Sequence, residues 1–289
     1  MRFGPFTAHI VSTVSTVSGP FWTLYSEFNL SDEGVADFHL RLISGGAILT
    51  KRAELFAEGR SLFGSFPREE SFAMLEWGMN ACVCAWAHNF LIIHAAIVAR
   101  DNIAVVIPGG SGSGKSTLAA ALVAGGWRLL SDELTLIRPD SGEAVPVVRP
   151  ISLKNESLQI AARLFSHPVF GPTLNVRRKG RMAHLKPDSH SVGRGHEPAF
   201  PGIFVFPAFG QDFFTELQPL QKARTFLLVA ENALNYGVLG RVGFETLTRL
   251  IDNADGYRLQ YGNLEAAVDE VEKLLLERSG CQVGAKGAA

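Results

Sequence analysis

The sequence predicts an α/β protein in which a glycine-rich loop joins a buried strand to a helix. The apolar run Ile103–Ile107 is typical of a buried strand, and the Ala- and Leu-rich run Thr117–Val123 is typical of a helix. Between them lies a glycine-rich stretch that ends in Gly-Lys-Ser, with the spacing of a phosphate loop. A strand, a loop and a helix in this order form the context that such a motif requires.

The loop consists of small residues followed by one cation and one hydroxyl. Its glycines permit positive φ angles, so backbone N–H groups can approach a polyphosphate at the positive end of the helix dipole. Lys115 can reach the β- and γ-phosphates, and the Ser116 hydroxyl can ligate Mg²⁺. A glycine-rich turn that binds nothing is the alternative, but Lys and Ser in register favour ATP with Mg²⁺. The expected nucleotide-binding residues are Gly109, Gly110, Ser111, Gly112, Ser113, Gly114, Lys115, Ser116 and Thr117.

Two adjacent acids, Asp132 and Glu133, follow the next predicted strand, Trp127–Leu130. A second apolar run, Leu134–Ile137, comes directly after them. In an open α/β sheet, strand ends near a phosphate loop are where ligands bind. An ordinary acidic turn explains the same spacing equally well, so from spacing alone both interpretations stay open.

His94 lies in the predicted strand Phe90–Ala99, which follows a predicted helix over 72–87. Residues 100–102 form a predicted tight turn into the strand before the phosphate loop. This hairpin would place His94 on the strand next to the loop. A single histidine in an apolar strand is more often a core residue than a catalytic one, so the residue pattern alone favours the core role.

Three blocks of the sequence occur in a recognisable order: Ile93-His94-Ala95-Ala96-Ile97-Val98, the loop 109–117, and Gly126-Trp127-Arg128-Leu129-Leu130-Ser131-Asp132-Glu133. They resemble the catalytic core of HPr kinase/phosphorylase, and more closely the bacterial HPr-kinase-related kinases. The resemblance covers about 92–137 well and the rest of the chain loosely. It implies a phosphate-loop kinase core of the HPr kinase and PEP carboxykinase type, in which helices flank a central mixed sheet.

The resemblance also implies roles for individual residues. Asp132 would accept the proton of the attacking hydroxyl, while Glu133, together with Ser116 and Asp132, would hold Mg²⁺. His94 would lie close to the reacting phosphate beside Lys115, which changes its interpretation from core residue to catalytic candidate. Members of the family assemble into oligomers, so a homo-oligomer is implied as well.

The chain also departs from the family pattern. HPr kinases have two aspartates where this chain has Asp132 and Glu133, and their downstream glycine-rich signature is not evident here. These departures argue against phosphorylase activity and against an HPr-type phosphocarrier as substrate. We therefore expect an ATP-dependent kinase that phosphorylates a hydroxyl, most simply a serine, on another protein or on a peptide.

The expected organisation is a small β-containing N-terminal region over 1–68, a kinase domain over 69–278 and a flexible tail over 279–289. In the first region, residues 9–17 and 38–43 are candidate strands. Beyond the core, we expect a strand over 145–151, a long loop over 166–201 and a strand over 203–207 that ends at its proline. A helix over 244–251, an edge strand over 257–261 and a helix capped by Asn263 and ending near Leu276 complete the prediction.

The predicted long loop carries a basic cluster that includes Arg177, Arg178 and Lys179. A solvated run of charges is one interpretation. The other is a flap that binds substrate, since cations that clamp a transferring phosphoryl group stabilise its spread charge.

Composition narrows the class of protein. The 289 residues are 47% hydrophobic and 19% charged, with a formal net charge of −1, so nucleic acid and anionic membranes are not expected partners. The three cysteines and scattered histidines lack metal-ligand spacing, which suits a reducing cytoplasm and predicts no zinc site. Besides the kinase, a small-molecule kinase and a nucleotide-binding regulator without transfer activity stay open.

Overall fold

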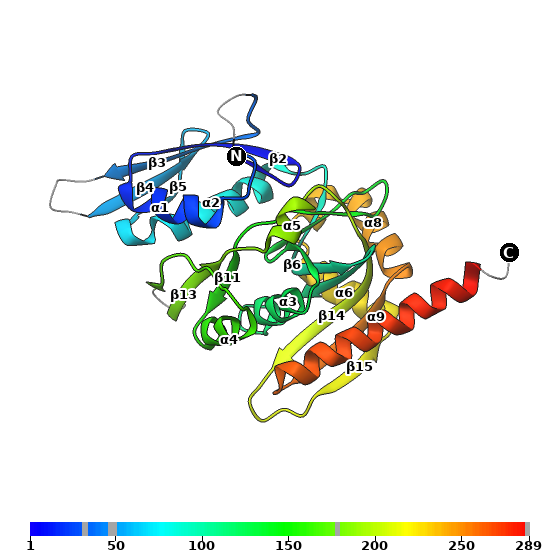
Figure 1. Cartoon of the computed structure of the whole chain (residues 1–289). Helices are drawn as coiled ribbons and strands as arrows, with labels where there is room; N and C mark the ends of the chain where they lie inside the picture. The colour runs from blue at the N-terminus through cyan, green and yellow to red at the C-terminus, as the bar shows by residue number, and fades with distance from the viewer. Residues whose placement is uncertain (31–33, 46–50, 177–179, 287–289) are drawn as a thin grey trace.

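The chain folds into three sheets flanked by helices, and the fold is α/β as the sequence predicts (Figure 1). The computed structural model describes residues 1–30, 34–45, 51–176 and 180–286. Within them, the strands form sheets of eight, five and three strands.

The eight-stranded sheet has the order β10-β9-β6-β7-β14-β16-β15, and β8 also pairs with β6. Strand β14 runs parallel to β7 and β16, whereas the other neighbours are antiparallel, so the sheet is mixed. Its strands are β6 (Leu91–Arg100), β7 (Ile103–Pro108), β8 (Arg128–Ser131), β9 (Leu134–Ile137), β10 (Ala144–Val145), β14 (Phe200–Phe209), β15 (Glu216–Leu220) and β16 (Asp255–Tyr261).

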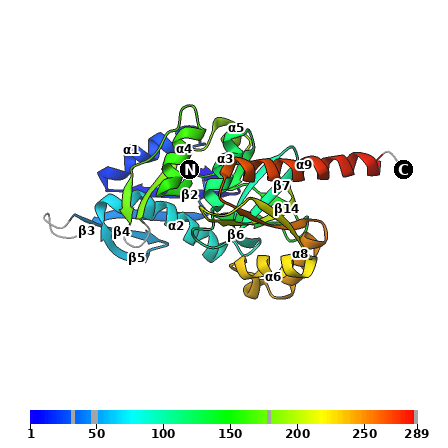
Figure 2. The same ribbon diagram turned by 90° about the horizontal axis from the view of Figure 1, so that it is seen from below.

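Helices cover both faces of this sheet, which explains why its inner strands are apolar on both sides (Figure 2). One face packs against α3 (Lys115–Ala124) and α9 (Leu264–Lys286). The other packs against α6 (Lys222–Asn232), α7 (Tyr236–Leu239) and α8 (Arg241–Asp252). Burial of apolar surface on both faces, at roughly 25 cal/mol per Å², stabilises this sheet.

The five-stranded sheet lies in the N-terminal region, in the order β1-β2-β3-β4-β5. Helices α1 and α2 pack on it and share one apolar core with its strands. A buried polar cluster joins this region to the segment after β10, because Tyr25 and Arg149 both bond to Glu76 of α2. The elements are β1 (Arg2–Phe3), β2 (Phe6–Ser12), α1 (Ser15–Leu24), β3 (Phe38–Gly45), β4 (Arg52–Ala57), β5 (Arg60–Pro67), a 3-10 turn (Arg68–Glu70) and α2 (Ser71–Trp86).

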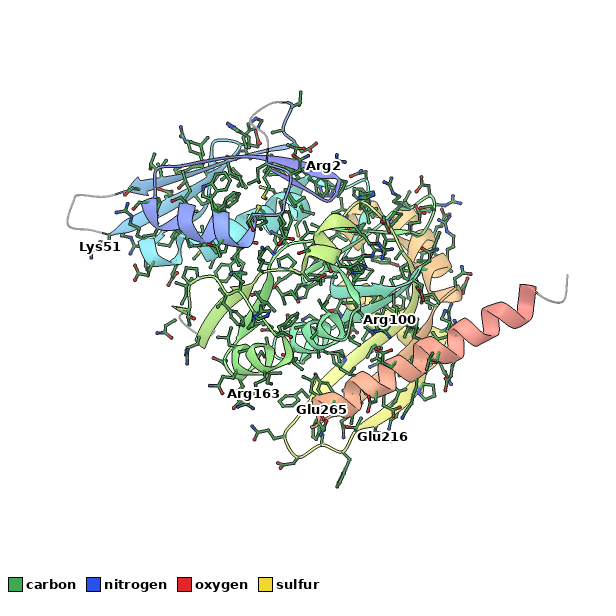
Figure 3. All side chains as sticks on the ribbon, viewed as in Figure 1. Arg2, Lys51, Arg100, Arg163, Glu216 and Glu265 are labelled. Atoms are coloured by element: carbon green, nitrogen blue, oxygen red, sulfur yellow. The ribbon has the colours of Figure 1, made fainter. Side chains whose placement is uncertain are left out.

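The three-stranded sheet, β11-β13-β12, contacts helix α3 through β11. Helix α4 follows β11 and contacts α3. The elements are β11 (Ile151–Lys154), α4 (Glu156–Leu164), β12 (Leu174–Val176), β13 (Gly180–Leu185) and α5 (Ser189–Gly193). Charged side chains such as Arg163, Glu216 and Glu265 project from the outside of the molecule (Figure 3).

Several expected elements are confirmed, including the hairpin of β6 and β7 and the helix after the phosphate loop. The expected strand over 9–17 is wrong beyond Ser12. Strand β2 ends there because the Ser12 hydroxyl accepts the N–H of Val14, and the buried Val14 and Val17 have the three-residue spacing of a helix face.

The expected strand over 145–151 is interrupted. Prolines at 146 and 150 lack N–H donors, so β10 ends at Val145 and β11 begins at Ile151. The expected long loop over 166–201 instead contains β12, β13 and α5.

Three expectations for the C-terminal part also need correction. Strand β14 continues past Pro207 to Phe209, because β7 pairs with it only as far as Phe204 and needs no N–H from the proline. Strand β16 is not an edge strand, since β15 covers its outer side. The last helix continues beyond Leu276 to Lys286.

Candidate functional site

The glycine-rich loop connects β7, an inner strand of the large sheet, to the first residue of α3. Gly112 and Gly114 have φ angles of +86° and +98°, which other residues rarely adopt. A Cβ atom on Gly114 would also lie 2.3 Å from the hydroxyl of Tyr261 on β16. Glycine is therefore required where the loop enters the helix.

Lys115 begins α3 and folds its side chain back over the loop. Its ammonium donates to the carbonyl oxygens of Gly109 at 2.6 Å and Gly110 at 3.1 Å. Burial lowers the pKa of Lys115, and the carboxyls of Asp132 and Glu133 oppose this shift. The cation is thus already directed at the concave side of the loop, where a phosphate would compete with the two carbonyls.

Asp132 lies in the short connection between β8 and β9 and is 6% exposed. Its Oδ2 atom accepts the backbone N–H of Ser152 at 2.9 Å, while its Oδ1 atom is buried and has no hydrogen-bond partner among the described residues. Such an orphaned oxygen indicates a position that a ligand can complete.

The protonation of Asp132 is unusual for a carboxyl group. Burial, and secondarily the charge of Glu133, raises its pKa to about 7. The Ser152 N–H, the nearby Ser116 hydroxyl and Lys115 all oppose this rise. The Ser116 hydroxyl lies near the carboxyl but forms no hydrogen bond of normal geometry with its Oδ1 atom. A carboxyl with this pKa can take a proton and release it near neutral pH.

His94 lies on β6 opposite Leu134 of β9, directly beside the acidic connection. The next residue, Ala95, donates its N–H to the carbonyl of Glu133 at 3.2 Å. Burial and the charge of Lys115 lower the pKa of His94, whereas Glu133 raises it. Because the pKa falls below its usual value near 6.5, the imidazole is neutral at pH 7.

The predicted residues therefore converge at one end of the large sheet. Lys115, Asp132, Glu133 and His94 influence one another electrostatically, and Ser116 lies beside Asp132. Thr117 differs, because its hydroxyl shares a 2.6 Å hydrogen bond with Ser157 of α4. The cluster Arg177, Arg178 and Lys179 lies outside the described residues.

The residues at this site suit a magnesium ion that phosphates help to hold. Among the described residues, no group of three or more His, Cys, Asp or Glu side chains is placed to hold a metal. Mg²⁺ commonly binds through one or two carboxylates plus phosphate oxygens and water. Glu133 and the Ser116 hydroxyl are oxygen donors of this kind, and both lie close to the Asp132 carboxyl.

Two neighbours of the site were not predicted from the sequence. Ser152 holds Asp132 through its backbone, and Lys154 lies close enough for its charge to lower the pKa values of Lys115 and His94. Both come from β11, whose position depends on pairing with β13. The segment Ile151–Lys154 has no local pattern that points to the loop.

Cavities lie elsewhere on the molecule as well. One of about 630 Å³ lies between β2 and α1, lined by residues such as Val17, Phe21 and Trp22. Another, of about 490 Å³, lies beside Trp127 and α4. Neither includes Lys115, Asp132 or His94, and the geometry of the side chains, not cavity volume, marks the candidate site.

None of the helices in the described ranges is long and apolar enough to cross a membrane. No protein-family model matches the chain. No curated protein is significantly similar to it.

Proposed function

We propose that this protein is an ATP-dependent kinase that transfers the γ-phosphoryl group of ATP to a hydroxyl, most simply a serine, on a protein or peptide. The observation that carries the proposal is the buried Asp132 carboxyl beside the phosphate loop. It has one free oxygen and a pKa near 7. The similarity of three sequence blocks to HPr-kinase-related kinases supports the same reaction.

In this proposal, loop N–H groups and Lys115 bind the triphosphate. When bound, Mg²⁺ would supply positive charge that neutralises the β- and γ-phosphate oxygens. Ser116 and Glu133 are its expected ligands, so the free Oδ1 atom of Asp132 stays available as a base. Most of the catalysis of phosphoryl transfer comes from such positioning and charge neutralisation.

The Oδ1 atom of Asp132 then accepts the proton of the acceptor hydroxyl as its oxygen bonds to the γ-phosphorus. The bond from that phosphorus to the bridging oxygen breaks, and ADP leaves with the bonding electrons. A carboxylate with a pKa near 7 is a stronger base than one with an ordinary pKa. The neutral His94 beside Lys115 can donate a hydrogen bond to a phosphate oxygen without adding charge.

The proposal is tested by incubating the protein with γ-labelled ATP, Mg²⁺ and lysate of the source organism. A labelled protein or peptide is expected with the wild type. Asp132→Asn should reduce labelling by about 10²- to 10⁴-fold, the usual contribution of a general base. Phosphate on a small metabolite alone would favour a small-molecule kinase instead.

Nucleotide binding provides the second measurement. Asp132→Asn should keep measurable affinity for ATP, whereas Lys115→Ala should weaken it by roughly 10- to 100-fold through loss of charge-assisted hydrogen bonds. Unchanged ATP affinity in Lys115→Ala would rule out the phosphate loop. Unchanged labelling in Asp132→Asn would rule out its role as the base.

A further inference from the structure

Lys154 occupies a rigid junction between β11 and α4. The next residue, Asn155, has a φ angle of +50°. Its N–H donates to the carbonyl of Arg181 at 2.8 Å, and its side-chain oxygen accepts the N–H of Arg181 at 3.1 Å. This two-way contact with β13 fixes the backbone that carries Lys154.

Contacts on both sides of Lys154 hold this junction against the candidate site. Two residues before it, the N–H of Ser152 binds the Asp132 carboxyl at 2.9 Å. Three residues after it, the hydroxyl of Ser157 shares a 2.6 Å hydrogen bond with Thr117, in the first turn of α3. The backbone that carries Lys154 is therefore held between the proposed base and the start of helix α3.

The charge of Lys154 has no partner in the described part of the chain. Its ammonium forms no hydrogen bond or ion pair with the described residues, although Lys154 is half-buried. Lys115, by contrast, bonds to two loop carbonyls. A partly buried cation is stabilised by an anion, and it otherwise keeps a cost of desolvation.

The position of this free charge limits which anion could bind it. Lys154 comes two residues after Ser152, whose N–H binds Asp132, and its charge lowers the pKa values of Lys115 and His94, so it lies close to the side chains of the candidate site. Within the proposed reaction, that is where the terminal phosphate of ATP would lie. The α-phosphate would lie deeper in the loop, nearer the N–H groups of α3.

We propose that Lys154 binds the γ-phosphoryl group of ATP and thereby makes the site prefer ATP to ADP, an inference that rests on the proposed kinase function. As the phosphoryl group moves to the acceptor, a cation on its outer side stabilises the charge spread over its oxygens. Lys154 would thus act on the transferred group, while Lys115 and the loop bind both nucleotides.

The test compares the affinities for ADP and for a non-hydrolysable ATP analogue, AMP-PNP, each with Mg²⁺, by calorimetry. Lys154→Ala should weaken the affinity for AMP-PNP by about 10- to 100-fold, which corresponds to the loss of a charge-assisted hydrogen bond. The affinity for ADP should stay within about twofold of the wild-type value. Lys154→Arg should keep most of the preference. Lys273→Ala is the matched control, because Lys273 lies exposed on α9 and pairs only with Glu270 among the described residues.

The results separate the two proposals. If Lys154→Ala weakens the affinities for AMP-PNP and ADP equally, or changes neither, the role of Lys154 is overturned while nucleotide binding stands. If the wild type binds neither nucleotide, the proposed function itself fails. Thermal unfolding without nucleotide should be unchanged in Lys154→Ala, and Lys154→Gln provides the same comparison if the alanine variant does not fold.

Discussion

Replacing Asp132 with Asn should remove a specific pH dependence from the stability of the protein. In the folded chain the pKa of Asp132 is raised from 3.8 to about 7. The folded state therefore holds its proton more tightly than the unfolded state, and stability falls as the pH rises between these two values. At 1.36 kcal/mol per pKa unit, the loss approaches roughly 4 kcal/mol above pH 7.

The substitution keeps an oxygen that can accept the Ser152 N–H, but its side chain cannot ionise. The introduced NH₂ group costs about 1–3 kcal/mol if it finds no acceptor, and this cost is the same at every pH. The signal is therefore the change with pH in the difference between variant and wild type. Other carboxyls with raised pKa values, such as Glu76, contribute equally to both proteins and cancel.

The assay is urea unfolding, without nucleotide or Mg²⁺, at intervals from pH 4 to pH 8. The stability of Asp132→Asn relative to wild type should increase by up to about 4 kcal/mol across this range, with most of the change complete near pH 7. Asp140→Asn is a suitable control, because Asp140 lies in the 138–143 turn and is not buried. A parallel pair of curves for Asp132→Asn and wild type would refute the raised pKa.

Two further predictions concern the structure around the site. Gly114→Ala should lower the free energy of unfolding by about 2–4 kcal/mol, because backbone strain at positive φ adds to the clash with Tyr261. Gly126→Ala should lower it by only about 1 kcal/mol, because Gly126 also has a positive φ but a Cβ atom there would meet nothing within 4 Å. Equal losses in thermal unfolding would show that the contact with Tyr261 is not limiting. Arg149→Met should lower the free energy of unfolding by about 3–5 kcal/mol, because it removes the cation that pairs with the buried Glu76 carboxylate. In denaturant unfolding, the double variant with Glu76→Gln should regain part of this loss. No restoration would mean that packing of Arg149, not its charge, matters.

The strand, glycine-rich loop and helix of the candidate site were predictable because their information is local. Gly112, Gly114 and Lys115 are close in the sequence, and the flanking apolar runs define the strand and the helix. The position of His94 on the strand next to β7 was also expected, since it needs only the hairpin of β6 and β7. The pKa shifts of His94 and Asp132 were not predictable, because they depend on burial that the fold creates.

The rest of the site depends on contacts between distant segments. Lys154 reaches it because β11 pairs with β13, and no motif in either strand indicates that pairing. Strand β13 was hidden in a segment rich in Pro, Gly and His, and β15 has polar, exposed residues without an apolar run. Tertiary pairing thus decided these elements where local propensity did not.

The most direct test of the central claim is a crystal structure of the protein with Mg²⁺ and AMP-PNP. We expect the triphosphate to lie in the loop 109–116 with Lys115 on its β- and γ-phosphates. The free oxygen of Asp132 should lie within about 3–5 Å of the place where an acceptor hydroxyl would approach the γ-phosphorus. A triphosphate bound elsewhere, or an Asp132 carboxyl directed away from the γ-phosphate, would contradict the kinase proposal.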